Sequence, residues 1–301
     1  MILDRFYISD WFRNLQDAAC NALEKCDGKG IFIEDMWQRP GGGGGRTRVI
    51  TNANIIEKGC VNFSAVHGLL PEKIAAQLNL KAAHDFFATG VSIVMHPHNP
   101  MVPIIHMNVR YFEISSGEKW FGGGIDLTPH YVNIEQAKYF HQTLKGVCDQ
   151  HHKTYYSEFK NWADEYFFIR HRSETRGIGG IFFDKLAETK EITLIERFEF
   201  VQHVAETFIP AYTKLMTENK DIPYGKKQKK WQMLRRGRYV EFNLVYDNGT
   251  KFGLETDGRA ESILLSMPPE ANWVYNFQTE EGSEEEHTQN LLKKEIDWIN
   301  F

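Results

Sequence analysis

Residues 91–113, VSIVMHPHNPMVPIIHMNVRYFE, decide how we expect this chain to fold. Two apolar runs of strand length flank the short linker PHNPMVP at 97–103, which favours a pair of neighbouring antiparallel strands. Side chains alternate between the two faces of a strand. His106, Asn108 and Arg110 therefore share one face of the second strand, while Val109 points to the other face.

Similar strand-like runs precede and follow this pair, at 30–39, 46–52, 59–68, 119–127 and 179–184. A further β-hairpin is predicted at 239–254, around Asn248-Gly249. Helical spacing covers 3–26, 71–78, 133–172 and 192–235, and an amphipathic helix ends the acidic tail. Strands and helices do not alternate strictly, which predicts an α+β fold with a large, mainly antiparallel sheet. We find no linker, so we expect a single domain over 1–301.

The composition narrows the class of protein. The chain has 301 residues, of which 42% are hydrophobic, and a net charge of −5 that argues against nucleic-acid binding. No apolar run approaches membrane-spanning length. The four cysteines lack CxxC spacing, and the first residues, MILDRFYISDWFRN, lack the Arg/Ser-rich bias of a transit peptide. We therefore expect a cytoplasmic protein.

The two strands of 91–113 carry an unusual set of polar side chains. Ser92 and His96 share one face of the first strand, and His106, Asn108 and Arg110 share one face of the second. A solvated sheet face would show interchangeable Lys, Glu and Thr instead. Because arginine suits bidentate binding of a carboxylate, this face is a candidate site for an anionic ligand. The alternative is a polar network that satisfies only itself.

Asp126 stands in the motif FGGGIDLTPH at 121–130, directly after three glycines and an isoleucine. Glycine allows a close approach between backbone and ligand. A carboxylate at such a surface can accept N–H donors or act as a base. The alternative is an aspartate that stabilises a turn or caps a helix.

Two further histidines occupy suggestive positions. His141 points inward from a helix, and His171 ends the aromatic segment DEYFFIRHR. Together with His96 and His106 they could form a metal site or a proton relay. No HxxxH or HExxH spacing supports a metal, and the alternative is a set of hydrogen-bonded structural histidines.

Two other segments suggest anion binding. The glycines at 41–45 lack a GK[ST] ending, so they predict either a mobile loop that carries Arg46 and Arg48 towards an anionic ligand or a flexible connector. The basic run at 226–238 has interleaved apolar residues and predicts an amphipathic helix, some of whose arginines could face an acidic ligand.

Several long motifs resemble one family. They are VSIVMHPHNPMVPIIHMNVRYFE, WFGGGIDLTPHY, DEYFFIRHRSETRGIGGIFFD, RRGRYVEFNLVYDNGTKFGLETDGR and ESILLSMPP. In this order, over about residues 5–275, they resemble the aerobic coproporphyrinogen III oxidases.

This resemblance implies a large antiparallel sheet flanked by helices on both faces, and a homodimer whose interface comes largely from residues of about 240–275. It implies an enzyme of haem biosynthesis that converts two propionates of coproporphyrinogen III to vinyl groups, giving protoporphyrinogen IX. O2 would be the oxidant, two molecules of CO2 would leave, and no organic cofactor would be needed.

The resemblance also implies roles for individual residues. His106 would be the proton donor, and we assign Asp126 to the pyrrole N–H groups as binder and base. Substrate contacts would come from Ser92, Asn108, Val109, Arg110, Gly258, Arg259 and Ala260. A divalent metal, for which Mn is one candidate, would match His96, His106, His141 and His171. Asp257 adds a charge beside this substrate segment.

Two other functions compete with this interpretation. A histidine-metal oxygenase acting on another organic acid would depend strictly on one metal. A tetrapyrrole carrier would bind the porphyrinogen and release no CO2.

Overall fold

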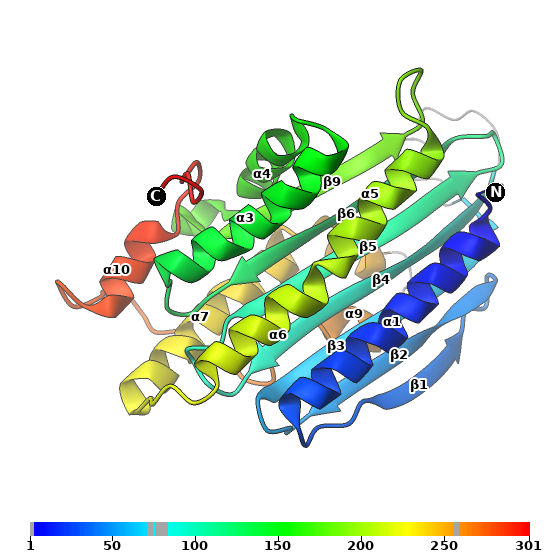
Figure 1. Ribbon diagram of the computed structural model, residues 1–301. Coiled ribbons are helices and arrows are strands. Elements are labelled where there is room, and N and C mark those ends of the chain that lie inside the picture. The colour runs from blue at the N-terminus through cyan, green and yellow to red at the C-terminus, as the bar shows by residue number, and fades with distance from the viewer. Residues whose placement is uncertain (1–2, 71–74, 76–83, 256–258) are drawn as a thin grey trace.

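The structure, a computed structural model, describes residues 3–70, 75, 84–255 and 259–301 (Figure 1). Its centre is a seven-stranded antiparallel sheet in the order β1-β2-β3-β4-β5-β6-β9. The strands are β1 (Ile33–Gln38), β2 (Gly43–Thr51), β3 (Ile56–Leu69), β4 (Asp85–Pro97), β5 (Ile104–Ile114), β6 (Lys119–Thr128) and β9 (Gly179–Ala187). The predicted strands, and the pairing of β4 with β5, are confirmed.

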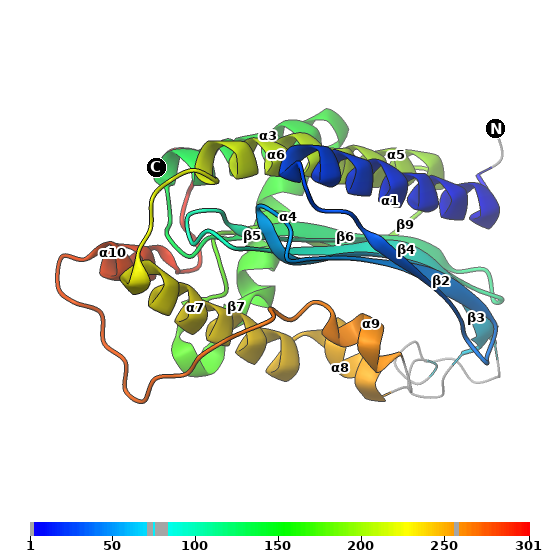
Figure 2. The same cartoon turned by 90° about the horizontal axis from the view of Figure 1, so that it is seen from below.

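Helices cover both faces of the sheet (Figure 2). The first face carries α1 (Arg5–Asp27), α3 (Ile134–His151), α5 (Leu194–Glu206) and α6 (Phe208–Asn219). The second face carries α7 (Lys226–Val245), α8 (Asn248–Glu255) and α9 (Ala260–Leu264). At the edge, α4 (Tyr155–Tyr166) packs against β9, and α10 (Glu284–Leu291) follows near the C-terminus. The α+β class is therefore confirmed.

Helix α1 shows how local sequence sets these elements. The Asp4 carboxylate accepts the backbone N–H groups of Phe6 and Tyr7, and Gly28 ends the helix in the left-handed conformation at φ 79°. The apolar face between these ends packs into the main core. This core fills the space between the sheet and the helices of its first face, α1, α3, α5 and α6. Odd-numbered residues of β5, such as Met107 and Val109, enter this core, so the even-numbered ones face α7.

The prediction of a β-hairpin at 239–254 is wrong. Helix α7 continues to Val245, and α8 starts at Asn248. The alternating apolar pattern also fits helical spacing, because Tyr239, Phe242 and Tyr246 lie on one face of a helix. Asn248-Gly249 opens α8 instead of a turn, and the Asp247 carboxylate accepts the backbone N–H of Thr250 there.

The basic run at 226–238 forms the predicted helix, but its last arginines do not face a ligand. Arg235 donates to Glu174 at 2.7 Å, Arg236 to Glu57 at 2.5 Å and Arg238 to Glu241 at 3.1 Å. Each pair lies largely out of solvent. Arg235 and Arg236 thereby join α7 to its surroundings, whereas the Arg238–Glu241 pair lies within α7.

Three expectations concern residues that lie outside the described ranges: the helix at 71–78, apart from residue 75, and the roles of Asp257 and Gly258. In the described part of the chain, no helix combines the length and the apolar character needed to cross a bilayer.

Candidate active site on the second face of the sheet

The predicted polar face exists and lies beneath α7 and α9. Ser92 on β4 is directly opposite Asn108 on β5, and Asn108 is opposite Gly124 on β6. Ser92, Asn108 and Arg110 are all half-buried, so each can still meet a ligand. The alternation of β4 and β5 therefore placed the three side chains together.

Glycine at position 122 shapes this face. Arg110 lies opposite Gly122, and its Nη2 reaches across β6 to the carboxylate of Asp184 on β9 at 3.1 Å. A Cβ added at Gly122 would come within 2.4 Å of that carboxylate and 2.9 Å of the Arg110 Nη2. Only glycine therefore leaves room for this contact.

A chain of three side chains leads from this face into the interior. Nδ1 of His106 lies 2.8 Å from Oδ1 of Asp126, its neighbour on β6. Nη2 of Arg176 lies 2.8 and 2.7 Å from the two oxygens of the same carboxylate. An ionised carboxylate can only accept, so Nδ1 of His106 carries the proton and Nε2 is left to meet a ligand.

The structure changes the role that we expected for Asp126. Its side chain lies beside His106 on the same face of the sheet and is only 2% exposed, so it does not reach the surface on which a ligand would lie. Burial opposes its ionisation, but the charge of Arg176 and the hydrogen bond from His106 outweigh burial and hold its pKa below the usual value. Asp126 is thus an anion that positions His106, and direct contact with pyrrole N–H groups is not open to it in this geometry.

Arg176 is a site residue that the sequence analysis missed. Its Nη1 donates to Oδ1 of Asn243 on α7 at 2.9 Å. Its guanidinium lies 4.4 Å from the ring centre of Phe167 and 4.7 Å from those of Tyr239 and Phe242. This aromatic enclosure favours a cation and keeps water away from the Arg176–Asp126 pair.

The RGIGG pattern at 176–180 was a usable signal for this contact. A Cβ on Gly177 would lie 2.2 Å from the carbonyl oxygen of Leu127 on β6. The glycine lets the chain pass close to β6, which brings Arg176 against Asp126.

Three of the four histidines predicted for a metal have other partners. His96 is buried, and its Nε2 lies 2.8 Å from the carbonyl oxygen of Ser266. His141, on α3, contacts the Tyr156 hydroxyl and the carbonyl oxygen of Ile178, each at 2.9 Å. Burial lowers the pKa of both imidazoles to about 3, so they are neutral.

His171 lies in a short 3-10 turn, η1 (Arg170–Arg172), at the surface. Its Nδ1 is 2.7 Å from the Tyr246 hydroxyl and its Nε2 is 2.8 Å from Glu241. Both ring nitrogens are therefore engaged with α7 and the residue that follows it.

The four histidines do not converge. His141 belongs to α3, which covers the opposite face of the sheet from α7 (Figure 2), whereas His106 is one of the β5 residues that face α7. Within the described ranges, no group of three or more His, Cys, Asp or Glu side chains is placed to hold a metal ion. The structure thus contradicts a metal site built from His96, His106, His141 and His171, because strand and helix geometry gives each a separate environment.

The remaining predicted substrate residues divide into two groups. Val109 is fully buried in the core on the first face, so its side chain cannot meet a ligand beside His106. Arg259 and Ala260 begin α9 above the second face, where Arg259 forms an ion pair with Asp35 of β1. Arg259 thus approaches the polar face from the side opposite to Arg110.

The glycines at 41–45 form part of a hairpin and not a mobile loop. Gly42 and Gly43, at φ 115° and 77°, make the turn from β1 into β2. Arg46 donates to Gln16 and Asp17 of α1 at 2.6 and 2.8 Å, and Arg48 lies 2.7 Å from Asp17. The prediction that these arginines face an anionic ligand is wrong, because α1 and β1 supply their carboxylates.

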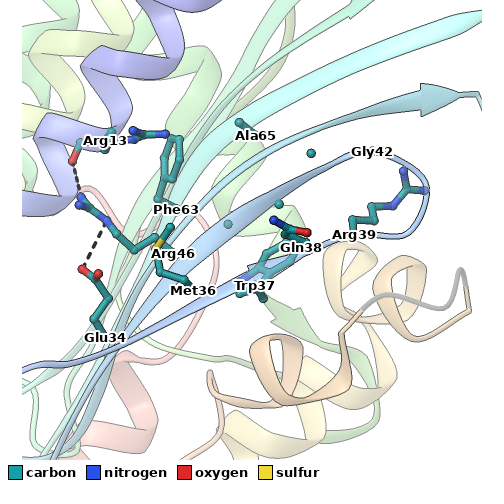
Figure 3. Close-up of a pocket in the computed structure, with 13 residues that line it drawn as sticks. Arg13, Glu34, Met36, Trp37, Gln38, Arg39, Gly42, Arg46, Phe63 and Ala65 are labelled. Atoms are coloured by element: carbon teal, nitrogen blue, oxygen red, sulfur yellow. Dashed lines mark hydrogen bonds and ion pairs between the residues drawn. The ribbon is translucent and has the colours of Figure 1, made fainter.

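Arg46 also borders a pocket of about 660 Å³ between α1 and the β1–β2 hairpin (Figure 3). Arg13, Met36, Arg39 and Phe63 contribute to its lining. Arg46 and Met36 project from the α1 face, so this pocket is separate from the face that carries His106.

An imidazole backed by a buried anion, together with guanidiniums on the same sheet face, defines an acid–base site for an anionic ligand. The family profile described as Coproporphyrinogen III oxidase matches residues 7–298. The chain is also 49% identical to the "Oxygen-dependent coproporphyrinogen-III oxidase" of Drosophila melanogaster over 298 residues. This alignment covers 95% of this chain and 76% of that relative. The chain belongs to the coproporphyrinogen III oxidase family, and the resemblance of its motifs is confirmed.

Proposed function

We propose that this chain catalyses the O2-dependent oxidative decarboxylation of coproporphyrinogen III to protoporphyrinogen IX in haem biosynthesis. The observation that carries the proposal is the match over residues 7–298, joined to a sheet face that presents His106 beside Arg110. Coproporphyrinogen III has four carboxylates and four pyrrole N–H groups. Its recognition needs guanidiniums at the rim and proton-transferring groups near the ring.

The atoms of the reaction balance with O2 as the oxidant. Each reacting propionate loses CO2 and one further hydrogen, which leaves a vinyl group and delivers two electrons. O2 accepts these electrons, together with the proton released from the propionate and one proton from solvent, and becomes hydrogen peroxide. Pyrrole electrons react with O2 once an N–H proton is removed, so the substrate supplies the reducing power and no organic cofactor is required.

His106 is the residue that we assign to proton transfer. Its Nδ1–H is held by Asp126, so Nε2 is directed to the ligand side of the sheet. Arg176 keeps Asp126 ionised, and Asp126 then stabilises an imidazolium when His106 takes up a proton. Ser92, Asn108, Arg110, Arg259 and Ala260 would bind and orient the substrate.

The first prediction concerns O2 and added cofactors. Purified protein should release CO2 from coproporphyrinogen III in air, without added flavin, nicotinamide or S-adenosylmethionine. Product identification by mass under air and under argon checks this. Equal turnover under argon would refute the proposal, binding without CO2 release would indicate a tetrapyrrole carrier, and activity restored by one metal after stringent chelation would favour a metal oxygenase.

The second prediction concerns Arg110→Ala. The change removes a guanidinium that is 38% exposed and can pair with a propionate, so substrate affinity should fall by about one to two decades. Isothermal titration under argon, with melting temperature as a check on folding, measures it. Unchanged affinity in a folded variant would exclude Arg110 from the binding site.

We also propose a homodimer. Support comes from exposed apolar side chains that gather in and beside 240–275, among them Leu244, Val245, Leu254, Leu264 and Trp273. Permanent dimers commonly bury more than about 2,000 Å² in such surfaces. The third prediction is that sedimentation shows a dimer at assay concentrations, which Leu244→Glu weakens; an active, stable monomer would contradict it.

A cytoplasmic location is proposed as well. All four cysteines are free thiols, and Cys20, Cys60 and Cys148 are buried, as suits a reducing compartment.

A further inference from the structure

Two arginines of the candidate site are each paired with an aspartate from the edge of the sheet. Nη2 of Arg110 lies 3.1 Å from Asp184 on β9. Arg259, at the start of α9, pairs with Asp35 on β1. Strands β1 and β9 are the two outer strands of the sheet, so one carboxylate stands at each side of the polar face.

Both pairs are open to solvent, unlike the Arg176–Asp126 pair beside His106. The side chains of Arg110 and Asp184 are 38% and 32% exposed, and those of Arg259 and Asp35 are 33% and 52% exposed. The Arg176–Asp126 pair, by contrast, is 2% exposed on each side. Exposed pairs contribute little to stability, so either arginine can exchange its aspartate for another carboxylate at small cost.

In each of the two arginines, the second terminal nitrogen, Nη1, is not bonded to the aspartate. Nη1 of Arg110 donates to Oδ1 of Asn108 at 3.0 Å, which keeps the guanidinium over the polar face. Nη1 of Arg259 is buried and has no hydrogen-bond partner among the described residues. A buried donor without an acceptor is costly, and a carboxylate that spans both nitrogens would satisfy it.

We propose that Asp35 and Asp184 compete with the propionates of the substrate for Arg259 and Arg110, and thereby weaken binding so that the product can leave. The inference rests on the proposed function, because it takes a polycarboxylate as the ligand. When a propionate binds either arginine, it comes close to the aspartate that it displaces, and the two negative charges repel each other. Without these aspartates, Arg110 and Arg259 would bind the carboxylates of the substrate and also the two that remain in the product, so the product would leave more slowly.

The variants Asp35→Asn and Asp184→Asn test this role. Each keeps the shape of the side chain and removes one charge. We expect coproporphyrinogen III to bind each variant about threefold to tenfold more tightly under argon, where turnover cannot occur. The double variant should show about the product of the two effects, since the residues lie at opposite edges of the sheet. In air, kcat of the variants should fall if product release limits turnover, while KM falls in every case.

Asp149→Asn is the matched control. Asp149 is an exposed aspartate of α3, paired with Lys145 on the opposite side of the sheet, and its loss changes the net charge equally. Asp35→Glu and Asp184→Glu retain the charge and should bind with affinity close to that of the unmodified protein.

Weaker binding by the asparagine variants would show that the aspartates position the arginines, and would overturn the proposal. So would tighter binding of equal size in Asp149→Asn, because the effect would then be one of net charge. If the unmodified protein neither binds nor turns over coproporphyrinogen III, the proposed function fails. If it does both and the asparagine variants are unchanged, only the present inference fails.

Discussion

Asp126→Asn is expected to lower both the stability of the fold and the rate of turnover. The amide leaves the buried charge of Arg176 without its anion, which costs about 3–5 kcal/mol of unfolding free energy. It also no longer fixes the proton on Nδ1 of His106, so kcat should fall by about two to four decades. If Asp126 were instead exposed on the ligand surface, Asp126→Asn would fold with normal stability.

Melting temperature and single-turnover rate, measured on the same preparation, separate the two effects. Asp164→Asn is a suitable control, because Asp164 is also buried and paired, with Lys160 at 2.6 Å on α4. That variant should lose stability and keep its turnover once folded. Normal turnover in folded Asp126→Asn would remove Asp126 from the positioning of His106.

His106→Gln is expected to reduce kcat by a similar two to four decades, with little change in stability. The imidazole is partly exposed, and Arg176 still pairs with Asp126 after its removal. Substrate affinity under argon should change little, since the arginines remain. Rapid-quench measurement of CO2 release gives the rate, and His203→Gln, on α5 at the other face, is the matched control.

The double variant His106→Gln/Asp126→Asn tests whether the two residues act together. If Asp126 acts through His106, the turnover rate of the double variant should resemble that of the slower single variant, and the two losses should not add. Multiplied losses would mean that Asp126 has a catalytic role of its own.

Local sequence was sufficient for the parts of the fold that depend on periodicity. The alternation in 91–113 predicted the β4–β5 pair and the common face of Ser92, Asn108 and Arg110, because side-chain direction follows directly from position along a strand. At 239–254 the same criterion failed. Both strand and helix periods fit that segment, and packing of Phe242 and Tyr239 around Arg176 favours the helix.

Periodicity does not predict which side chains from distant segments of the chain form hydrogen bonds or ion pairs. The motif around Asp126 indicated a functional carboxylate, but its burial depends on Arg176, fifty residues later along the chain. Likewise, Arg46 was predicted to meet a ligand and pairs with Asp17 of α1, while His141 lies on a helix at the other face of the sheet from His106. An isolated motif specifies which groups are present and which face they share. The tertiary structure decides which of their charges are already neutralised, because that depends on side chains brought close only when the sheet and its two helical layers assemble.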